Sequence, residues 1–108
     1  MRLTLAQMRE RADYWLERLE MGEWRGRVLV LYKSAGELER LTGVDAAAGC
    51  WWSPEECRGE IYIRRGHNTE SNLLHEIGHI LISGHETPGP ATVHVERAIN
   101  RLVAGLLA

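Results

Sequence analysis

The chain has 108 residues, and its 13 basic and 15 acidic side chains give a net charge of −2 at pH 7. A chain of this length can bury a substantial core but cannot hold a separate specificity domain, so we expect one domain over residues 1–108. The near-neutral charge and the dispersed basic residues argue against a nucleic-acid partner and against binding to an anionic membrane.

The N-terminal segment contains no apolar core of signal-peptide length, and no stretch of the sequence approaches the length of a membrane span. We therefore expect a cytoplasmic protein without a membrane partner. In that compartment we favour free thiols for Cys50 and Cys57, whose spacing matches no zinc-binding pattern. A disulfide between them would require the two residues to face each other across a hairpin.

The N-terminal half of the chain contains three predicted elements. Residues 4–20 predict an amphipathic helix, because apolar side chains recur there every three or four positions. Residues 27–32 are rich in valine and leucine and predict a buried strand. Ser34 is a suitable N-cap for a short helix over residues 35–41, with Glu37 in the capping-box position.

Residues 46–63 predict a β-hairpin with Pro54 in its turn. Trp51 and Trp52 lie on the first arm, and we expect them to pack against the sheet rather than to contact a ligand. The return strand, residues 59–63, immediately precedes the loop into the next helix. We therefore expect this strand to form the edge of the sheet, where an extended peptide could pair with it.

Residues 72–83 predict a helix that contains the sequence His-Glu-Ile-Gly-His. Because residues four apart lie on one face of a helix, His75 and His79 can bind the same ion. Zinc accepts two imidazoles and one further protein ligand, and a catalytic site leaves the fourth position to water. Glu76 can reach that water without binding the metal, which is the general-base position of H-E-x-x-H metalloproteases. The alternative is a buried helix whose two histidines are simply hydrogen-bonded, and we expect Gly78 to allow close approach of another segment.

Four downstream residues are candidates for the third ligand: His85, Glu86, His94 and Glu96. His85 has the histidine spacing of metzincins, but Ile82 replaces the glycine of that pattern and no methionine follows the helix. Glu96 instead lies on a predicted helix over residues 92–107, where Asn100 follows one turn later and could support a ligand by hydrogen bonding. Three apolar side chains of this helix are expected to face the core: Ala98, Leu102 and Leu106.

The pairing of HEIGH with ERAINRLVAGLL resembles the ImmA/IrrE-type metallopeptidase domain, whose second motif is approximately E-x-x-A-N-x-x-A-x-x-L-L, and more broadly the gluzincins. In its short length the chain is similar to the minigluzincins. The resemblance implies that His75, His79 and Glu96 bind zinc, that Glu76 is the general base, and that Asn100 supports the site. It covers about the last forty residues of the chain well.

We therefore expect an α+β, zincin-like domain in which a small sheet packs against the HExxH helix and the following glutamate-bearing helix. The expected function is that of a zinc metallopeptidase that cleaves peptide bonds in extended or unfolded protein segments. The alternatives are a zinc-bearing regulatory or binding module without turnover, and another hydrolase with the same metal chemistry. Retention of Glu76 favours an enzyme. Four side chains could stabilise the oxyanion: Tyr62, His67, His94 and Arg97.

Overall fold

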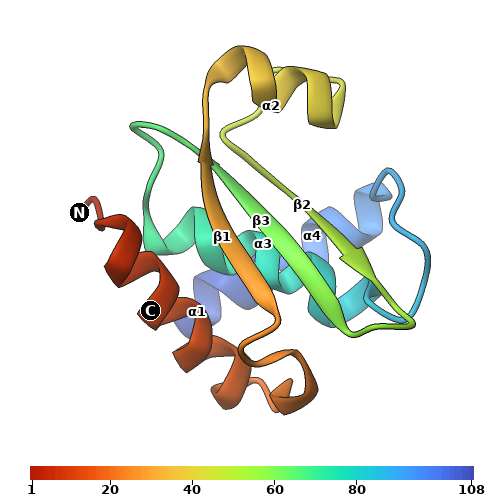
Figure 1. The fold of residues 1–108 in the computed structure, drawn as a ribbon. Helices are drawn as coiled ribbons and strands as arrows, with labels where there is room; N and C mark the ends of the chain where they lie inside the picture. The colour runs from red at the N-terminus through yellow and green to blue at the C-terminus, as the bar shows by residue number, and fades with distance from the viewer.

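The computed structural model describes residues 1–108 and has an α+β architecture, as predicted (Figure 1). Its elements in chain order are α1 (Leu5–Arg18), a short 3-10 helix η1 (Gly22–Trp24), β1 (Val28–Lys33), α2 (Ala35–Thr42), β2 (Ala48–Ser53), β3 (Arg58–Arg64), α3 (Glu70–Ser83) and α4 (Val93–Leu106). None of the helices combines the length and the apolarity needed to cross a membrane.

Local capping signals determine where the helices begin. Thr4 with Gln7 and Ser34 with Glu37 each form a reciprocal capping box, at the starts of α1 and α2 respectively. Thr69 caps α3 by accepting a hydrogen bond from a backbone N–H of the first turn. The predicted helices are therefore present, with boundaries that differ from the predicted ones by one or two residues.

The sheet has the strand order β1-β3-β2, and β3 is parallel to β1 and antiparallel to β2 (Figure 1). The expectation that residues 59–63 form the sheet edge is therefore wrong, because β3 is paired on both sides. Pairing with β1 places Val30 beside Ile61, and both side chains are almost fully excluded from water. This burial stabilises β3 in the central position, so that the first arm of the hairpin, β2, becomes an edge strand.

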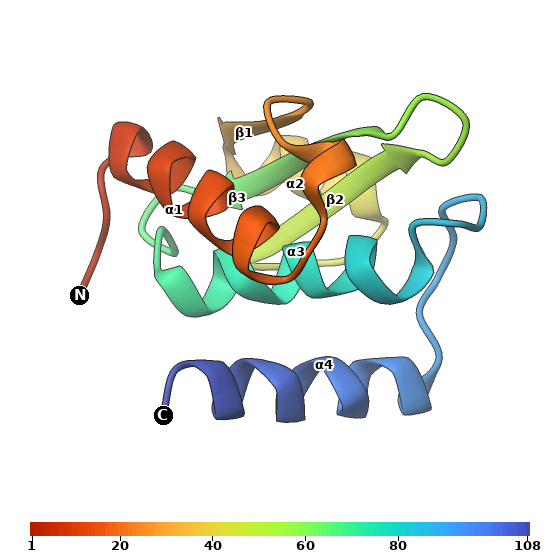
Figure 2. The same cartoon turned by 90° about the horizontal axis from the view of Figure 1, so that it is seen from below.

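The helices form layers on the two faces of the sheet. Helix α3 packs on one face together with α1, and α4 lies on the side of α3 that is away from the sheet (Figure 2). Helix α2 covers the opposite face near the start of β2, where the Thr42 methyl group and the Leu38 side chain occupy the space beside Gly49. The sheet thus packs directly on α3, and the glutamate-bearing helix forms an outer layer on α3.

The two neighbouring tryptophans of β2 have different surroundings, because successive side chains of a strand point to opposite faces. Trp52 is buried in the core, and its indole N–H donates a hydrogen bond of 2.7 Å to the carbonyl of Glu86. Trp51 is 36% exposed on the other face, with the Arg58 guanidinium 5.0 Å from its ring centre. The prediction that both pack against the sheet therefore holds fully only for Trp52, which also ties the loop after α3 to the hairpin.

Helix α4 contacts α3 through a stripe centred on Ile99 and Val103, both buried. Of the predicted stripe, Leu106 packs against the core, whereas Ala98 is exposed and Leu102 is only half-buried, so the prediction is wrong for these two residues. The reason lies on α3: a Cβ atom added at Gly78 would lie 3.0 Å from Cγ2 of Ile99. The absence of a side chain at Gly78 lets Ile99 pack against the α3 backbone, as the glycine led us to expect.

We predict that Gly78→Val lowers the free energy of unfolding by about 1–3 kcal/mol, because the new side chain must displace Ile99 and with it α4. Gly105→Val is the matched control, since a Cβ atom there meets no atom within 4 Å. Urea denaturation of both variants and of the unsubstituted protein measures the difference. Equal stabilities of the two variants would contradict the close contact between the helices.

Candidate metal centre

His75 and His79 lie one turn apart on α3, with their ring centres 5.0 Å from each other. The helix is held in this rotation by its other side chains, because Leu74 and Ile77 are completely buried in the core. The two imidazoles consequently lie on the flank of α3 that meets α4, with exposed side-chain fractions of 25% and 14%. The predicted pair therefore shares one face.

Glu96 reaches both histidines from α4. Its two carboxylate oxygens lie 3.2 Å from Nε2 of His75 and 3.0 Å from Nε2 of His79. Thr92 caps α4 immediately before its first turn, which contains Glu96. The structure thus brings together His75, His79 and Glu96, the three predicted ligands, although they come from two helices.

The three side chains fit the requirements of a zinc site. One ligand atom from each residue lies within 4.8 Å of the other two. Tetrahedral zinc with bonds of about 2.0–2.1 Å separates its ligand atoms by about 3.3 Å, close to the distances of 3.2 Å and 3.0 Å between the Glu96 oxygens and the two imidazoles. Two imidazole nitrogens and one carboxylate oxygen are also a donor set that zinc accepts. Hydrogen bonds between an imidazole and a carboxylate have similar lengths. Measurement of the zinc content therefore distinguishes a metal site from a hydrogen-bonded group of the same three side chains.

The other candidate residues of the sequence lie elsewhere. His85 is exposed and has only Glu86 as a charged neighbour, 3.6 Å away, and His94 is exposed at the start of α4. Asn100 is exposed and its side chain makes no hydrogen bond, so the expected support of the Glu96 carboxylate is not present. The rotation of α4 that buries Ile99 leaves Asn100 in solvent.

Glu76 is the single buried charged residue of the chain, with 6% of its surface exposed. Burial raises the pKa of this carboxyl to about 7; the adjacent Cys50 thiol partly opposes the rise, and the charge of Glu96 adds to it. A carboxyl with a pKa near neutrality can both accept and release a proton under physiological conditions. In the metal-free protein, the predicted general base therefore holds a proton more readily than an exposed carboxylate does.

Two neighbours of Glu76 are held in their neutral forms. Burial lowers the pKa of His79, although the Glu96 carboxylate opposes this, so that the neutral imidazole required for metal binding is favoured. Burial also raises the pKa of the Cys50 thiol far above its ordinary value, and the charge of Glu76 acts in the same direction. Cys50 is therefore a neutral thiol at the site, without the reactivity of a thiolate.

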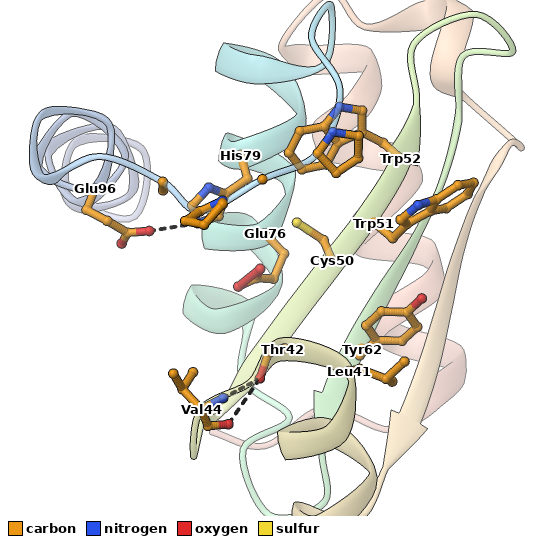
Figure 3. Close-up of a pocket in the computed structure, with 14 residues that line it drawn as sticks. Leu41, Thr42, Val44, Cys50, Trp51, Trp52, Tyr62, Glu76, His79 and Glu96 are labelled. Carbon is orange, nitrogen blue, oxygen red and sulfur yellow. Dashed lines mark hydrogen bonds and ion pairs between the residues drawn. The ribbon is translucent and has the colours of Figure 1, made fainter.

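A cavity of about 520 Å³ opens beside these residues (Figure 3). Glu76, His79 and Glu96 line one side of it, and β2, the end of α2 and residues 88–91 complete its walls. The contributions of α2 and β2 were not expected from the sequence. The alternation of side chains along β2 can indicate which of its residues face the cavity. It does so only when β2 is already known to be the edge strand.

Of the four candidate oxyanion donors, only Tyr62 lines the cavity. Tyr62 lies on the face of the sheet opposite α3, where its hydroxyl donates a 2.9 Å hydrogen bond to Glu60. Burial raises the pKa of Tyr62 to about 12, and the bond to Glu60 acts in the same direction. His67, His94 and Arg97 do not line the cavity.

No family model, no curated protein and no solved structure matches this chain. The likeness to the ImmA/IrrE domain and to the gluzincins therefore remains a resemblance between short motifs. The structure adds one fact to that resemblance: His75 and His79 of the first motif and Glu96 of the second lie side by side.

We predict that His75→Ala, His79→Ala and Glu96→Ala each weaken zinc binding by roughly a hundredfold or more, because each removes one of three protein ligands. Competition with a chromogenic chelator measures the zinc affinity of each variant. His85→Ala is the control and should bind zinc like the unsubstituted protein. The assignment of Glu96 is wrong if His85→Ala loses the metal and Glu96→Ala keeps it.

A second prediction concerns the stability of the metal-free protein between pH 5 and pH 8. The folded-state pKa of Glu76, about 7, lies above the ordinary value of 4.5, so its stabilising contribution is complete below pH 4.5 and is lost as the pH rises through 7. Glu76→Gln has no carboxyl to ionise. Its free energy of unfolding should therefore rise relative to the unsubstituted protein by about 2–3 kcal/mol over this range.

Urea denaturation in the presence of a chelator at a series of pH values measures this difference. Both proteins keep His79, so its contribution to the pH dependence cancels in the comparison to first approximation. A difference that stays constant from pH 5 to pH 8 would show that Glu76 titrates at its ordinary pKa.

Proposed function

We propose that this protein is a small zinc metallopeptidase of the gluzincin type, in which His75, His79 and Glu96 hold the metal. The observation that carries the proposal is the position of Glu76, which is buried in the wall of the same cavity but stands outside the group of three ligands. A purely structural metal site has no use for such a carboxyl. Burying one also destabilises the fold unless it has a function or a partner.

A zinc ion bound there would supply Lewis acidity toward a carbonyl group and would lower the pKa of a water molecule. Glu76 would accept the proton of that water and later deliver it to the leaving amine, as its place in the cavity wall outside the three ligands allows. His79 remains neutral through its burial, as a metal ligand must. These roles require no charged nucleophile from the protein.

The free edge of β2 supports an extended peptide as the substrate. In the antiparallel pair of β2 and β3, the Arg64 N–H donates to the carbonyl of Ala47, so residues 47, 49, 51 and 53 of the hairpin exchange hydrogen bonds with β3. The backbone groups of Ala48, Cys50 and Trp52 therefore point away from β3. An extended peptide can pair with them as an added strand, which gives affinity through the main chain.

This mode requires a substrate segment without its own secondary structure, because its backbone groups must be free to pair with β2. We therefore propose unfolded or flexible protein segments as substrates and expect folded proteins to resist cleavage. The strand belongs to the cavity, since Cys50, Trp51 and Trp52 all line it. A paired peptide would thus pass beside Glu76 and His79.

A zinc-bearing regulatory or binding module without turnover is the second candidate function. It is favoured by the positions of His67, His94 and Arg97 outside the cavity, and by the Tyr62 hydroxyl, whose proton is already donated to Glu60. A module without turnover does not account for the burial of Glu76. We therefore prefer the enzyme, and Glu76 is the residue that separates the two candidates.

We also propose a cytoplasmic location. Cys50 and Cys57 are both free thiols. Cys50 faces Ile61 across the hairpin, and Cys57 lies in the turn rather than opposite Cys50. Two thiols in this arrangement lack the cross-strand geometry of a disulfide and are compatible with a reducing compartment.

We predict that Glu76→Gln lowers the rate of hydrolysis of an unfolded protein by roughly 100-fold to 10,000-fold, the usual contribution of a general base. Its zinc content should be unchanged, because Glu76 is not a ligand. Glu86→Gln is the control: this glutamate has an exposed side chain and lies outside the cavity. Zinc-dependent hydrolysis by Glu76→Gln at the unsubstituted rate would refute the assigned role.

A further inference from the structure

Two exposed apolar side chains line the cavity on the side of β2 that faces away from α3. Leu41, at the end of α2, is 53% exposed, and Trp51 of β2 is 36% exposed. Neither is needed to hold its element in place, since Leu38 anchors α2 and Trp52 anchors β2 in the interior. Apolar surface that remains exposed in the wall of a cavity is typical of a ligand-binding surface. We call Leu41 and Trp51 the outer wall.

The outer wall and the candidate metal centre belong to one continuous cavity that passes around the free edge of β2. Figure 3 shows Leu41 and Trp51 on one side of this strand and Glu76 and His79 on the other. The pleat of the strand explains why β2 lines both sides of the cavity. Cys50 points toward α3, whereas Trp51, the next residue, points away from it. A ligand that follows the edge therefore contacts both sides.

Packing of α2 on the sheet positions the outer wall. A Cβ atom at Gly49 would lie 2.7 Å from Cγ2 of Thr42, so the glycine lets the end of α2 come close to the start of β2. This close approach brings Leu41 to the cavity beside the edge strand. Arg58 lies over the Trp51 ring, 5.0 Å from its centre, and restrains the indole through a cation–π contact.

We propose that the outer wall selects substrates with a large apolar side chain, such as leucine or phenylalanine, on the alternate positions of the paired segment that face Trp51. This inference rests on the proposed pairing of an extended substrate with β2. In a paired strand, side chains alternate between the faces, so every second residue of the substrate lies on the side of Leu41 and Trp51. The residues between them face Glu76 and His79. The selected feature is therefore one apolar side chain in a fixed register with the metal centre.

The test measures peptide binding in the absence of turnover. The probe is a set of fluorescein-labelled, unstructured peptides built from serine and alanine, with a single leucine or a single aspartate moved along the sequence. They are titrated against zinc-loaded Glu76→Gln, and fluorescence anisotropy reports the Kd. We expect leucine to bind roughly tenfold more tightly than aspartate at alternate positions, the scale of partly burying one leucine side chain.

Adding Leu41→Asn to the Glu76→Gln protein should abolish most of the preference for leucine without changing the zinc content or the melting temperature. Leu29→Asn is the matched control. Leu29 is 56% exposed and lies on the same face of the sheet, on β1, but does not line the cavity. The control should keep the full preference, because it removes an equally exposed leucine from a surface outside the cavity.

A preference that is lost with Leu41→Asn and kept with Leu29→Asn supports the inference. The inference is overturned if both variants keep the preference, if both lose it equally, or if no peptide binds measurably. The proposed enzymatic function is judged separately, by whether Glu76→Gln loses zinc-dependent hydrolysis of an unfolded protein. Turnover without a leucine preference would thus refute only the role of the outer wall. A leucine preference without turnover would instead indicate a peptide-binding zinc module.

Discussion

The close contact between α3 and α4 at Gly78 is the constraint on which the candidate metal centre depends. Ile99 packs into the space that a side chain at Gly78 would fill, and this contact brings the two helices together. Glu96 lies one turn earlier on α4, and at this interhelical distance its carboxylate reaches His75 and His79. Helix α4 packs mainly on α3. The contact between Ile99 and Gly78 and the meeting of His75, His79 and Glu96 therefore hold the same two helices together, so each stabilises the other.

The burial of α3 explains the character of Glu76. The helix presents Leu74 and Ile77 to the core, and this rotation leaves Glu76 in the wall of the cavity with little contact with water. Removal of water raises the pKa of the carboxyl to about 7. A single rotation of one helix therefore accounts for the packing of the core, the placement of the two imidazoles and the proton affinity of the candidate base.

The order of the strands determines what can approach this centre. With β3 paired on both sides, the hairpin turns its first arm outward, and β2 offers unpaired backbone groups along the cavity. The outer half of the cavity then comes from α2, which packs closely over Gly49. Elements from the N-terminal half of the chain thus shape a site whose chemical groups all lie in the C-terminal half.

The sequence alone determined the features that depend on neighbours along the chain. The spacing of His75, Glu76 and His79 predicted their placement on one helix, the caps predicted where the helices begin, and the motif around Glu96 identified the third member of the group. These signals are local, because a helix relates residues three or four positions apart whatever surrounds it.

The tertiary structure alone decided the strand order, the face that α4 presents to α3, and the walls of the cavity. The central place of β3 depends on burial of Val30 beside Ile61, two residues far apart in the sequence. The exposure of Asn100 likewise follows from the contact of Ile99 with Gly78. Such contacts form because they increase the total apolar surface that the folded chain removes from water. The periodicity of one segment cannot predict them, because it carries no information about which distant segment packs against it.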